Sequence, residues 1–284
     1  MSRISLVVAT LGRVLEIEEL VQSLATQTYQ DYDLIIVDQN LDDRLIPVID
    51  FAHSLGIEVS HIRQTEPNQC LARNTGLMQA QGNIIAFPDD DCWYEPDLLE
   101  KVSTRMNDQD TPECVVVRWV EQDPVGAKPH QLSTLLWRRF QEVQASCITL
   151  FFNRDLLLDM HGFDSALGLH SWYGGSEETD LMFRVMAKDN KVVYLPDALV
   201  HHPINKLANL PLLKAFAQSR SRARGTGALY AKHSLEIWVI LRGLVSPWFY
   251  AICTLMNPVV TIVELGKAIG RLEGFIGWKV NKTS

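Results

Sequence analysis

Short apolar runs alternate with segments of helical periodicity along the first hundred residues. Runs rich in β-branched residues are typical of buried strands, and they occur at residues 4–9, 34–37, 57–62 and 83–87. The segments between them space apolar residues three and four apart, as in the stretch containing Ile17, Leu20, Val21 and Leu24. Further helices are predicted at residues 44–55, 71–80 and 96–106. This alternation predicts an α/β fold with a mostly parallel central sheet flanked by helices.

The pattern is less regular after residue 110. Strands are predicted at residues 114–120, 147–152, 192–195 and 198–201, and helices at residues 132–140, 177–187 and 207–216. Residues 123–130 contain two prolines and a glycine and are expected to form a loop. Residues 161–176 are rich in glycine and aromatic residues, which favours a mobile loop that lines a site.

Polar residues follow the predicted strands at the place where parallel sheets bind their ligands, beyond the carboxyl ends of the strands. They are Thr10, Arg13, Asp38 and the triplet Asp89, Asp90 and Asp91. Three adjacent carboxylates repel one another unless a cation or water screens them. The triplet therefore suits Mn²⁺ or Mg²⁺ bridged to phosphate oxygens, and a solvated acidic turn is the alternative.

Three further groups have both a chemical and a plainer interpretation. Arg73 suits a diphosphate, because guanidinium matches phosphate geometry, or it is an ordinary surface arginine on a helix. Glu177 or Glu178, at a predicted helix start, suits proton transfer from a substrate hydroxyl, or it only complements the helix dipole. His201 and His202 either include a metal ligand or form a polar strand end.

Charge and cysteine content narrow the class of protein. The net charge of the 284-residue chain is -8, which argues against nucleic-acid binding. Residues 1–200 carry 15 basic and 31 acidic residues, whereas residues 201–284 carry 11 basic and 3 acidic residues. The basic tail contacts either an anionic membrane or the acidic body of the protein. Five widely spaced cysteines and no secretory signal favour the reducing cytoplasm.

The tail contains an uncharged stretch at residues 243–263, interrupted by Pro247 and Pro258. As a continuous helix it would measure about 31 Å, enough to cross a bilayer core. Trp238, Trp248, Tyr250 and Trp278 are residue types that favour the membrane interface. Three interpretations stay open: a hairpin or amphipathic pair in the membrane surface, a helical element packed on the domain, and a membrane span.

Taken in order, these residues resemble the family 2 glycosyltransferases, inverting enzymes with the nucleotide-diphospho-sugar transferase fold of the GT-A type. The matching pieces lie at residues 5–13, 31–40, 71–99 and 162–185. The resemblance implies a GT-A domain at residues 1–203, followed by a helical, basic and apolar membrane-associating segment at residues 204–284.

The resemblance also implies roles for individual residues. Thr10, Arg13 and Asp90 would lie by the nucleotide sugar, Asp38 would bond the base, and Arg73 would lie near the diphosphate. Asp89 and Asp91 match the outer acids of the Asp-x-Asp metal motif, with Asp91 favoured for direct coordination of Mn²⁺ or Mg²⁺. His202, favoured over His201, would complete the metal site.

Glu178 matches the catalytic base, but the chain departs from the family there. The family usually has Glu-Asp where this chain has Glu177-Glu178, so either glutamate is a candidate base. Trp172 and Tyr173, in the loop before them, are expected either to stack on a sugar ring or to pack in the core.

The Gln-x-x-Arg-Trp signature of processive synthases is absent, which implies transfer of a single sugar. The implied donor carries UDP or dTDP, and the acceptor is a glycan or a lipid-linked glycan of surface polysaccharide assembly. A peripheral position at the cytoplasmic face of the membrane fits the tail.

Three alternatives belong to other classes of protein. A nucleotidyltransferase would need a basic, glycine-rich loop after the first strand, and residues 10–13 contain one glycine. A non-catalytic relative would bind nucleotide sugar or act as a membrane scaffold. A purely structural membrane-surface protein would leave the acidic strand ends unexplained.

Overall fold

The structure is a computed structural model that describes all residues except 1, 144, 205–208 and 282–284. The chain divides into two compact units. One comprises Met1–Phe163 and Leu181–Ile204, and the other comprises Asp164–Asp180 and Asn205–Ser284. We call them the sheet unit and the helical unit.

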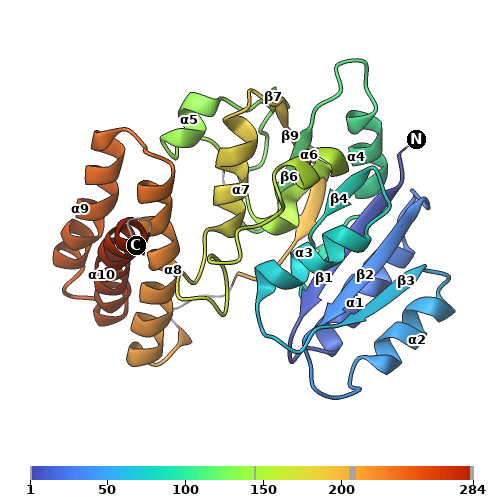
Figure 1. The fold of residues 1–284 in the computed structure, drawn as a ribbon, viewed down its shortest axis with the longest axis horizontal. Coiled ribbons are helices and arrows are strands. Elements are labelled where there is room, and N and C mark those ends of the chain that lie inside the picture. The colour runs from blue at the N-terminus through green and yellow to red at the C-terminus, as the bar shows by residue number, and fades with distance from the viewer. Residues whose placement is uncertain (1, 144, 205–208, 282–284) are drawn as a thin grey trace. The chain divides into compact units, whose positions relative to one another are not determined.

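The strands of the sheet unit form a sheet in the order β3-β2-β1-β4-β8-β6-β9-β5, with β7 beside β9. Figure 1 shows its first strands, β3, β2 and β1, side by side. Their bounds are β1 (Ile4–Thr10), β2 (Tyr32–Asp38), β3 (Val59–Arg63), β4 (Ile84–Ala86), β5 (Trp93–Tyr94), β6 (Cys114–Trp119), β7 (His130–Gln131), β8 (Leu150–Asn153) and β9 (Val192–His201). The first four strands pair in parallel, as predicted. β8 runs antiparallel to both β4 and β6, and β9 returns parallel to β6.

Helices cover both faces of the parallel strands. They are α1 (Leu15–Ala25), α2 (Ile46–Ser54), α3 (Gln69–Gln79) and α4 (Leu98–Met106). Apolar residues of α1, α2 and α4 form one core with alternate residues of β1 and β2, including Leu6 and Leu34. The opposite face packs on α3, which approaches so closely that a Cβ at Gly76 would overlap Val7. The periodicity prediction for α1 is confirmed, since Ile17, Leu20, Val21 and Leu24 are its buried residues.

Later elements differ from the prediction in detail. Short helices α5 (Thr134–Arg138) and α6 (Arg154–Asp159) flank the second half of the sheet, and α6 is absent from the prediction. The strand expected at residues 147–152 begins as a 3₁₀ turn, Cys147–Thr149, capped by Ser146. The two strands expected at 192–195 and 198–201 are one strand, β9. Its pairing with β6 skips the three residues after Leu195, because Pro196 has no N–H to donate.

The helical unit contains three long helices, α8 (Leu212–Lys232), α9 (Ile237–Cys253) and α10 (Pro258–Asn281). Part of the helix predicted at residues 207–216 lies outside the described residues, and α8 continues 16 residues beyond its predicted end. Gly266, Gly270 and Gly274 lie on successive turns of α10, and a Cβ at any of them would overlap α8. Because these glycines have no side chain, the backbones of α8 and α10 can approach each other closely.

The helix α7 (Glu177–Met186) begins in the helical unit and continues into the sheet unit. Pro258 is the first residue of α10, a position where proline is favoured, so the uncharged stretch is divided between two helices. Among the helices of the described chain, none is both long enough and apolar enough to cross a membrane.

Candidate active site

The strand ends of the sheet unit bring predicted site residues together. In the parallel register Thr10 lies opposite Asp38, and Asp38 lies opposite Arg63. β4 ends at Ala86 and leads through Pro88 into the acidic triplet. The polar residues after β1, β2 and β4 therefore lie at the carboxyl edge of the sheet, where such folds bind ligands.

Three side chains hold the acidic triplet. The Thr10 hydroxyl donates to Asp90 at 2.7 Å, and the Arg13 guanidinium donates to Asp90 at 2.8 Å. Arg13 also forms an ion pair with Asp91. Arg73, buried on α3, donates to Asp89 at 2.7 Å. Six predicted residues thus form one network, and because Arg73 is buried it is not the ordinary surface arginine of the alternative interpretation.

His202 joins the triplet from the carboxyl end of β9. Its Nε2 lies 2.9 Å from a carboxylate oxygen of Asp91 and 3.9 Å from one of Asp89. One ligand atom from each of Asp89, Asp91 and His202 lies within 4.8 Å of the others. Two carboxylates and an imidazole form a donor set suited to Mn²⁺, so these residues fit a divalent metal. The His202 backbone is held by the Trp119 indole, which donates to its carbonyl at 3.0 Å.

His201 has different surroundings. Its Nδ1 lies 2.8 Å from Glu121 and its Nε2 lies 3.0 Å from Glu95. Its ring stacks on Trp93 with centroids 5.2 Å apart. Both ring nitrogens of His201 are therefore engaged by glutamates, whereas His202 contacts the aspartates.

Burial and charge oppose each other in the triplet. Burial raises the pKa of Asp90 to about 6, although the Thr10 hydrogen bond and the Arg13 charge act to lower it. Burial also acts to raise the pKa of Asp91, but the hydrogen bonds and charges of His202 and Arg13 outweigh it and lower the net value. The same contact with Asp91 outweighs burial at His202 and raises the pKa of that imidazole. A metal held by Asp91 and His202 would compete with the proton on the His202 nitrogen that faces Asp91.

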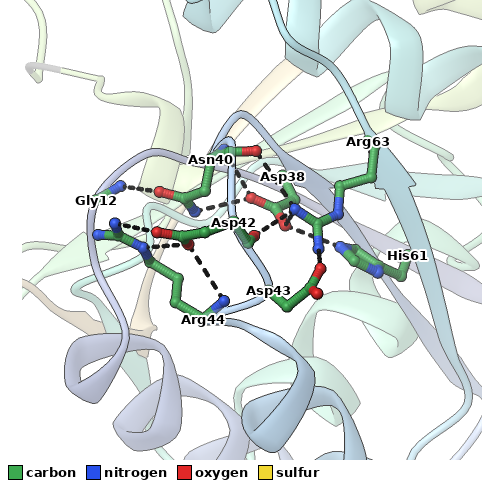
Figure 2. A network of polar contacts seen from close by, with 8 residues as sticks. All are labelled: Gly12, Asp38, Asn40, Asp42, Asp43, Arg44, His61 and Arg63. Carbon is green, nitrogen blue, oxygen red and sulfur yellow. Dashed lines mark hydrogen bonds and ion pairs between the residues drawn. The ribbon is translucent and has the colours of Figure 1, made fainter.

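Asp38 lies in a second network at the same sheet edge (Figure 2). It is fully buried, and one carboxylate oxygen accepts from the backbone and side-chain nitrogens of Asn40, both at 2.8 Å. The other oxygen lies 3.0 Å from His61 Nε2 and 3.3 Å from Arg63. In this structure the carboxylate thus orders the loop after β2. Contact with a base, implied by the resemblance, stays a prediction.

Asn40, His61 and Arg63 were missed from the sequence. His61 lies in the third predicted strand and Arg63 directly follows its predicted end, so their spacing of two residues, which places them on one face of a strand, was a usable signal. Asn40 also accepts from the backbone N–H of Gly12 at 2.7 Å, which joins the loops after β1 and β2 (Figure 2). Arg63 pairs in addition with Asp43 at 2.6 Å.

The residue next to Arg73 holds the start of the glycine-rich loop. The Asn74 amide donates to the Phe163 carbonyl and accepts from the Phe163 N–H, both at 2.8 Å. Gly162 has a φ of +64°, and a Cβ there would overlap the Asn74 amide oxygen. The two sequence pieces at residues 71–99 and 162–185 therefore meet through Asn74, which the sequence analysis places beside Arg73 without a role of its own.

The two candidate bases begin α7 in the helical unit. Glu177 is buried and Glu178 is half-buried. Tyr173 is buried against Trp278 of α10, with ring centroids 5.2 Å apart, so it packs within the unit. Trp172 stays half exposed and lies against the Arg224 guanidinium at 4.7 Å. The fully buried Asp180, one turn after Glu177, has no predicted role.

A mixed sheet with parallel strands β1 to β4, helices on both faces and polar residues at its strand ends is the fold of the GT-A nucleotide-sugar transferases. Solved structures share this fold. The mannosyltransferase PcManGT from Pyrobaculum calidifontis, in complex with GDP-Man and Mn²⁺, matches with a TM-score of 0.62 and 15% identity, over 99% of this chain and 73% of that one. Residues 1–349 of S. aureus TarS, in complex with UDP, match with a TM-score of 0.58 and 13% identity, over 98% and 92% of the two chains.

The family model for Glycosyl transferase family 2 matches residues 5–157, more than half of the chain, and the chain belongs to this family. An uncharacterized glycosyltransferase, YwdF of Bacillus subtilis, is 31% identical over 108 residues, which are 38% of this chain and 40% of YwdF. The glucosyl-dolichyl phosphate glucuronosyltransferase of Haloferax volcanii is 26% identical over 218 residues, which are 71% of this chain and 69% of that protein. The match spans less than half of YwdF, and more than two thirds of the Haloferax enzyme.

Proposed function

We propose that the chain is an inverting glycosyltransferase that moves one sugar from a nucleotide-diphospho-sugar to an acceptor hydroxyl. The observation that carries this proposal is the convergence of Asp89, Asp91 and His202 beside the guanidinium groups of Arg13 and Arg73. Two carboxylates, an imidazole and two cations at the carboxyl edge of a GT-A sheet suit a metal-bound diphosphate.

Each residue of the network has a task in this proposal. Asp89, Asp91 and His202 would hold Mn²⁺ or Mg²⁺, which when bound would neutralise charge on the leaving diphosphate. Arg73 is buried next to Asp89 and presents a fixed positive charge to the same group. Thr10 and Arg13 hold Asp90, which keeps the triplet in one conformation before the donor arrives.

Glu178 takes the proton of the acceptor hydroxyl in this proposal, with Glu177 as the second candidate. A carboxylate suits this task, and displacement with one base and no covalent intermediate inverts the anomeric carbon. The TarS structures with UDP and UDP-GlcNAc support a uridine nucleotide, and PcManGT with GDP-Man makes GDP the contrasting choice. A glycan or lipid-linked glycan is the proposed acceptor.

Turnover of a donor panel tests the function. We expect the full chain with Mn²⁺ to release nucleoside diphosphate from one class of donor among UDP-, dTDP- and GDP-sugars, with slow transfer to water when no acceptor is added. The measurement is a coupled assay of diphosphate release, with EDTA-treated protein as the control. Metal-dependent binding of a nucleotide without release from any donor would favour the alternative, a non-catalytic nucleotide-sugar-binding or scaffold protein.

We further propose that the helical unit lies on the cytoplasmic face of a membrane. The outer face of α9 exposes apolar side chains one turn apart: Ile237, Leu241, Val245, Phe249 and Ile252. The turn after α9 continues this surface with Leu255 and Met256, and Met256 is 98% exposed. Residues 237–263 contain no acidic residue. An apolar helix face with exposed Trp238, Trp248 and Tyr250 suits the membrane interface.

A vesicle experiment tests this surface. We expect the chain to sediment with vesicles containing phosphatidylglycerol, and the double variant Phe249→Ser, Met256→Ser to bind at least ~10-fold more weakly, because each buried apolar side chain contributes about 1.5–3 kcal/mol. Leu213→Ser, at an 82% exposed position on α8, is the matched control. A stable dimer in solution that loses its contact in the double variant, with no vesicle binding, would contradict a membrane partner.

A further inference from the structure

The loop that leads to the candidate bases packs on α8 within the helical unit. A Cβ on Gly174 would overlap the Ser221 hydroxyl, and a Cβ on Gly225 would overlap the carbonyl of Gly175. Glycine at these positions lets the loop backbone rest directly on the helix backbone. The backbone of the segment just before Glu177 is therefore in direct contact with one turn of α8.

Apolar and aromatic contacts also hold this loop against α8 and α10. Leu167, Tyr173 and Ala228 are buried together, and Trp278 of α10 packs against them. Trp172 contacts Arg224 of α8, which also pairs with Glu273 of α10 at 2.9 Å. The loop thus contacts α8 and α10 through several of its residues between Leu167 and Gly175.

A buried ionic group holds the first turn of α7, just after the candidate bases. Asp180 is fully buried, and one of its oxygens lies 2.7 Å from Lys232 Nζ and 2.7 Å from His233 Nε2. Lys232 also pairs with Asp164 at the start of the loop, at 2.5 Å. The last residue of α8 therefore joins both ends of the segment 164–180. A buried carboxylate without such partners would be strongly disfavoured.

We propose that α8 positions the catalytic base, with Lys232 and His233 as positioning residues that act through Asp180. This inference rests on the proposed function. Gly174 and Gly175, which precede Glu177 and Glu178 in the sequence, contact α8. Asp180, which follows them, contacts Lys232 at the end of α8. The helical unit then has a role in the sugar transfer itself, in addition to the membrane contact proposed for α9.

The proposal has a specific kinetic signature. A base displaced by about 1 Å costs on the order of 10²-fold in rate, whereas donor affinity depends on the strand ends of the sheet unit. Loss of the Lys232 contact should therefore lower kcat and leave nucleotide binding unchanged. A role limited to general stability would lower both together.

The test compares charge variants in the full chain. With the donor that the wild type turns over, we expect Lys232→Met to lower kcat for diphosphate release at least tenfold, with the Kd of the nucleotide in the presence of Mn²⁺ within twofold of wild type. Lys232→Arg should restore kcat to within about threefold. Lys267→Met is the matched control, because Lys267 pairs only along α10 with Glu264 among the described contacts, at 2.7 Å.

A steric variant covers the case in which Lys232→Met does not fold. Gly225→Ala pushes the loop backbone, and Gly266→Ala, whose Cβ would overlap the Ser219 hydroxyl, acts between α10 and a residue of α8 that is not among the loop contacts named above. We expect the larger kcat loss for Gly225→Ala. Unchanged kcat in folded Lys232→Met and Gly225→Ala, or a parallel loss of kcat and nucleotide affinity, would overturn the proposal. A wild type that releases no diphosphate from any donor would instead refute the proposed function.

Discussion

Glu178→Gln is expected to lower sugar transfer by about 10²–10⁴-fold, the usual contribution of a general base. Glutamine keeps the shape of the side chain but cannot take a proton. The measurement is kcat for diphosphate release or sugar transfer, with the nucleotide Kd determined on the same preparation. Donor binding should stay intact, because the proposed metal ligands Asp89, Asp91 and His202 and the guanidinium groups of Arg13 and Arg73 are unchanged in this variant.

Glu177→Gln is the matched variant for this prediction. The two glutamates are adjacent, equal in chemistry and both at the start of α7, but Glu177 is buried and Glu178 is half-buried. We expect the smaller loss for Glu177→Gln, since an acceptor must reach the base. The opposite order would assign the base to Glu177, and retained turnover in both variants would remove the base from this motif.

Asp91→Ala is expected to abolish metal-dependent nucleotide binding, with a loss of at least ~100-fold in affinity. Asp91 contacts His202 and Arg13, so its removal takes away one proposed metal ligand and one carboxylate partner of both side chains. A change at a residue that only orients a metal ligand typically costs 10–100-fold in metal affinity, and loss of the ligand itself should cost more. Calorimetry of UDP, dTDP and GDP with and without Mn²⁺ measures this effect.

Asp155→Ala is the control for the charge change, because its side chain is 90% exposed on α6. It should bind nucleotide as the wild type does. Equal metal-dependent affinity in Asp91→Ala and wild type would refute the assignment of Asp91 as a ligand. A wild-type nucleotide Kd that is the same with and without Mn²⁺ would refute the metal site.

The first half of the fold could be predicted because its signal is local. The parallel strands β1, β2 and β4 contain short, buried apolar runs, and the buried positions of α1 follow one face of a helix. The family resemblance is confirmed by the match to residues 5–157. Short elements such as α6 were missed because six residues carry too little periodicity.

The part of the candidate site that lies at the strand ends could be predicted from the sequence. Thr10, Arg13 and the aspartate triplet follow strands directly, so the parallel topology alone brought them together. The partners of Asp180 were not predictable, because Lys232 and His233 lie more than 50 residues away on a helix whose position no local pattern fixes. The basic tail was expected to contact a membrane or the acidic body, and its charge count did not reveal that Arg220 and Arg224 both pair with Glu273 of α10.

The distribution of thiols has a practical consequence for studying the surface of α9. Cys70, Cys92, Cys114 and Cys147 are buried, whereas Cys253 is exposed at the last residue of α9, beside the apolar turn. A thiol-reactive fluorophore would therefore label the native chain at one position, and that position lies where lipid contact is proposed. The natural sequence thus carries its own reporter for the environment of the α9 tip, and no cysteine has to be introduced or removed.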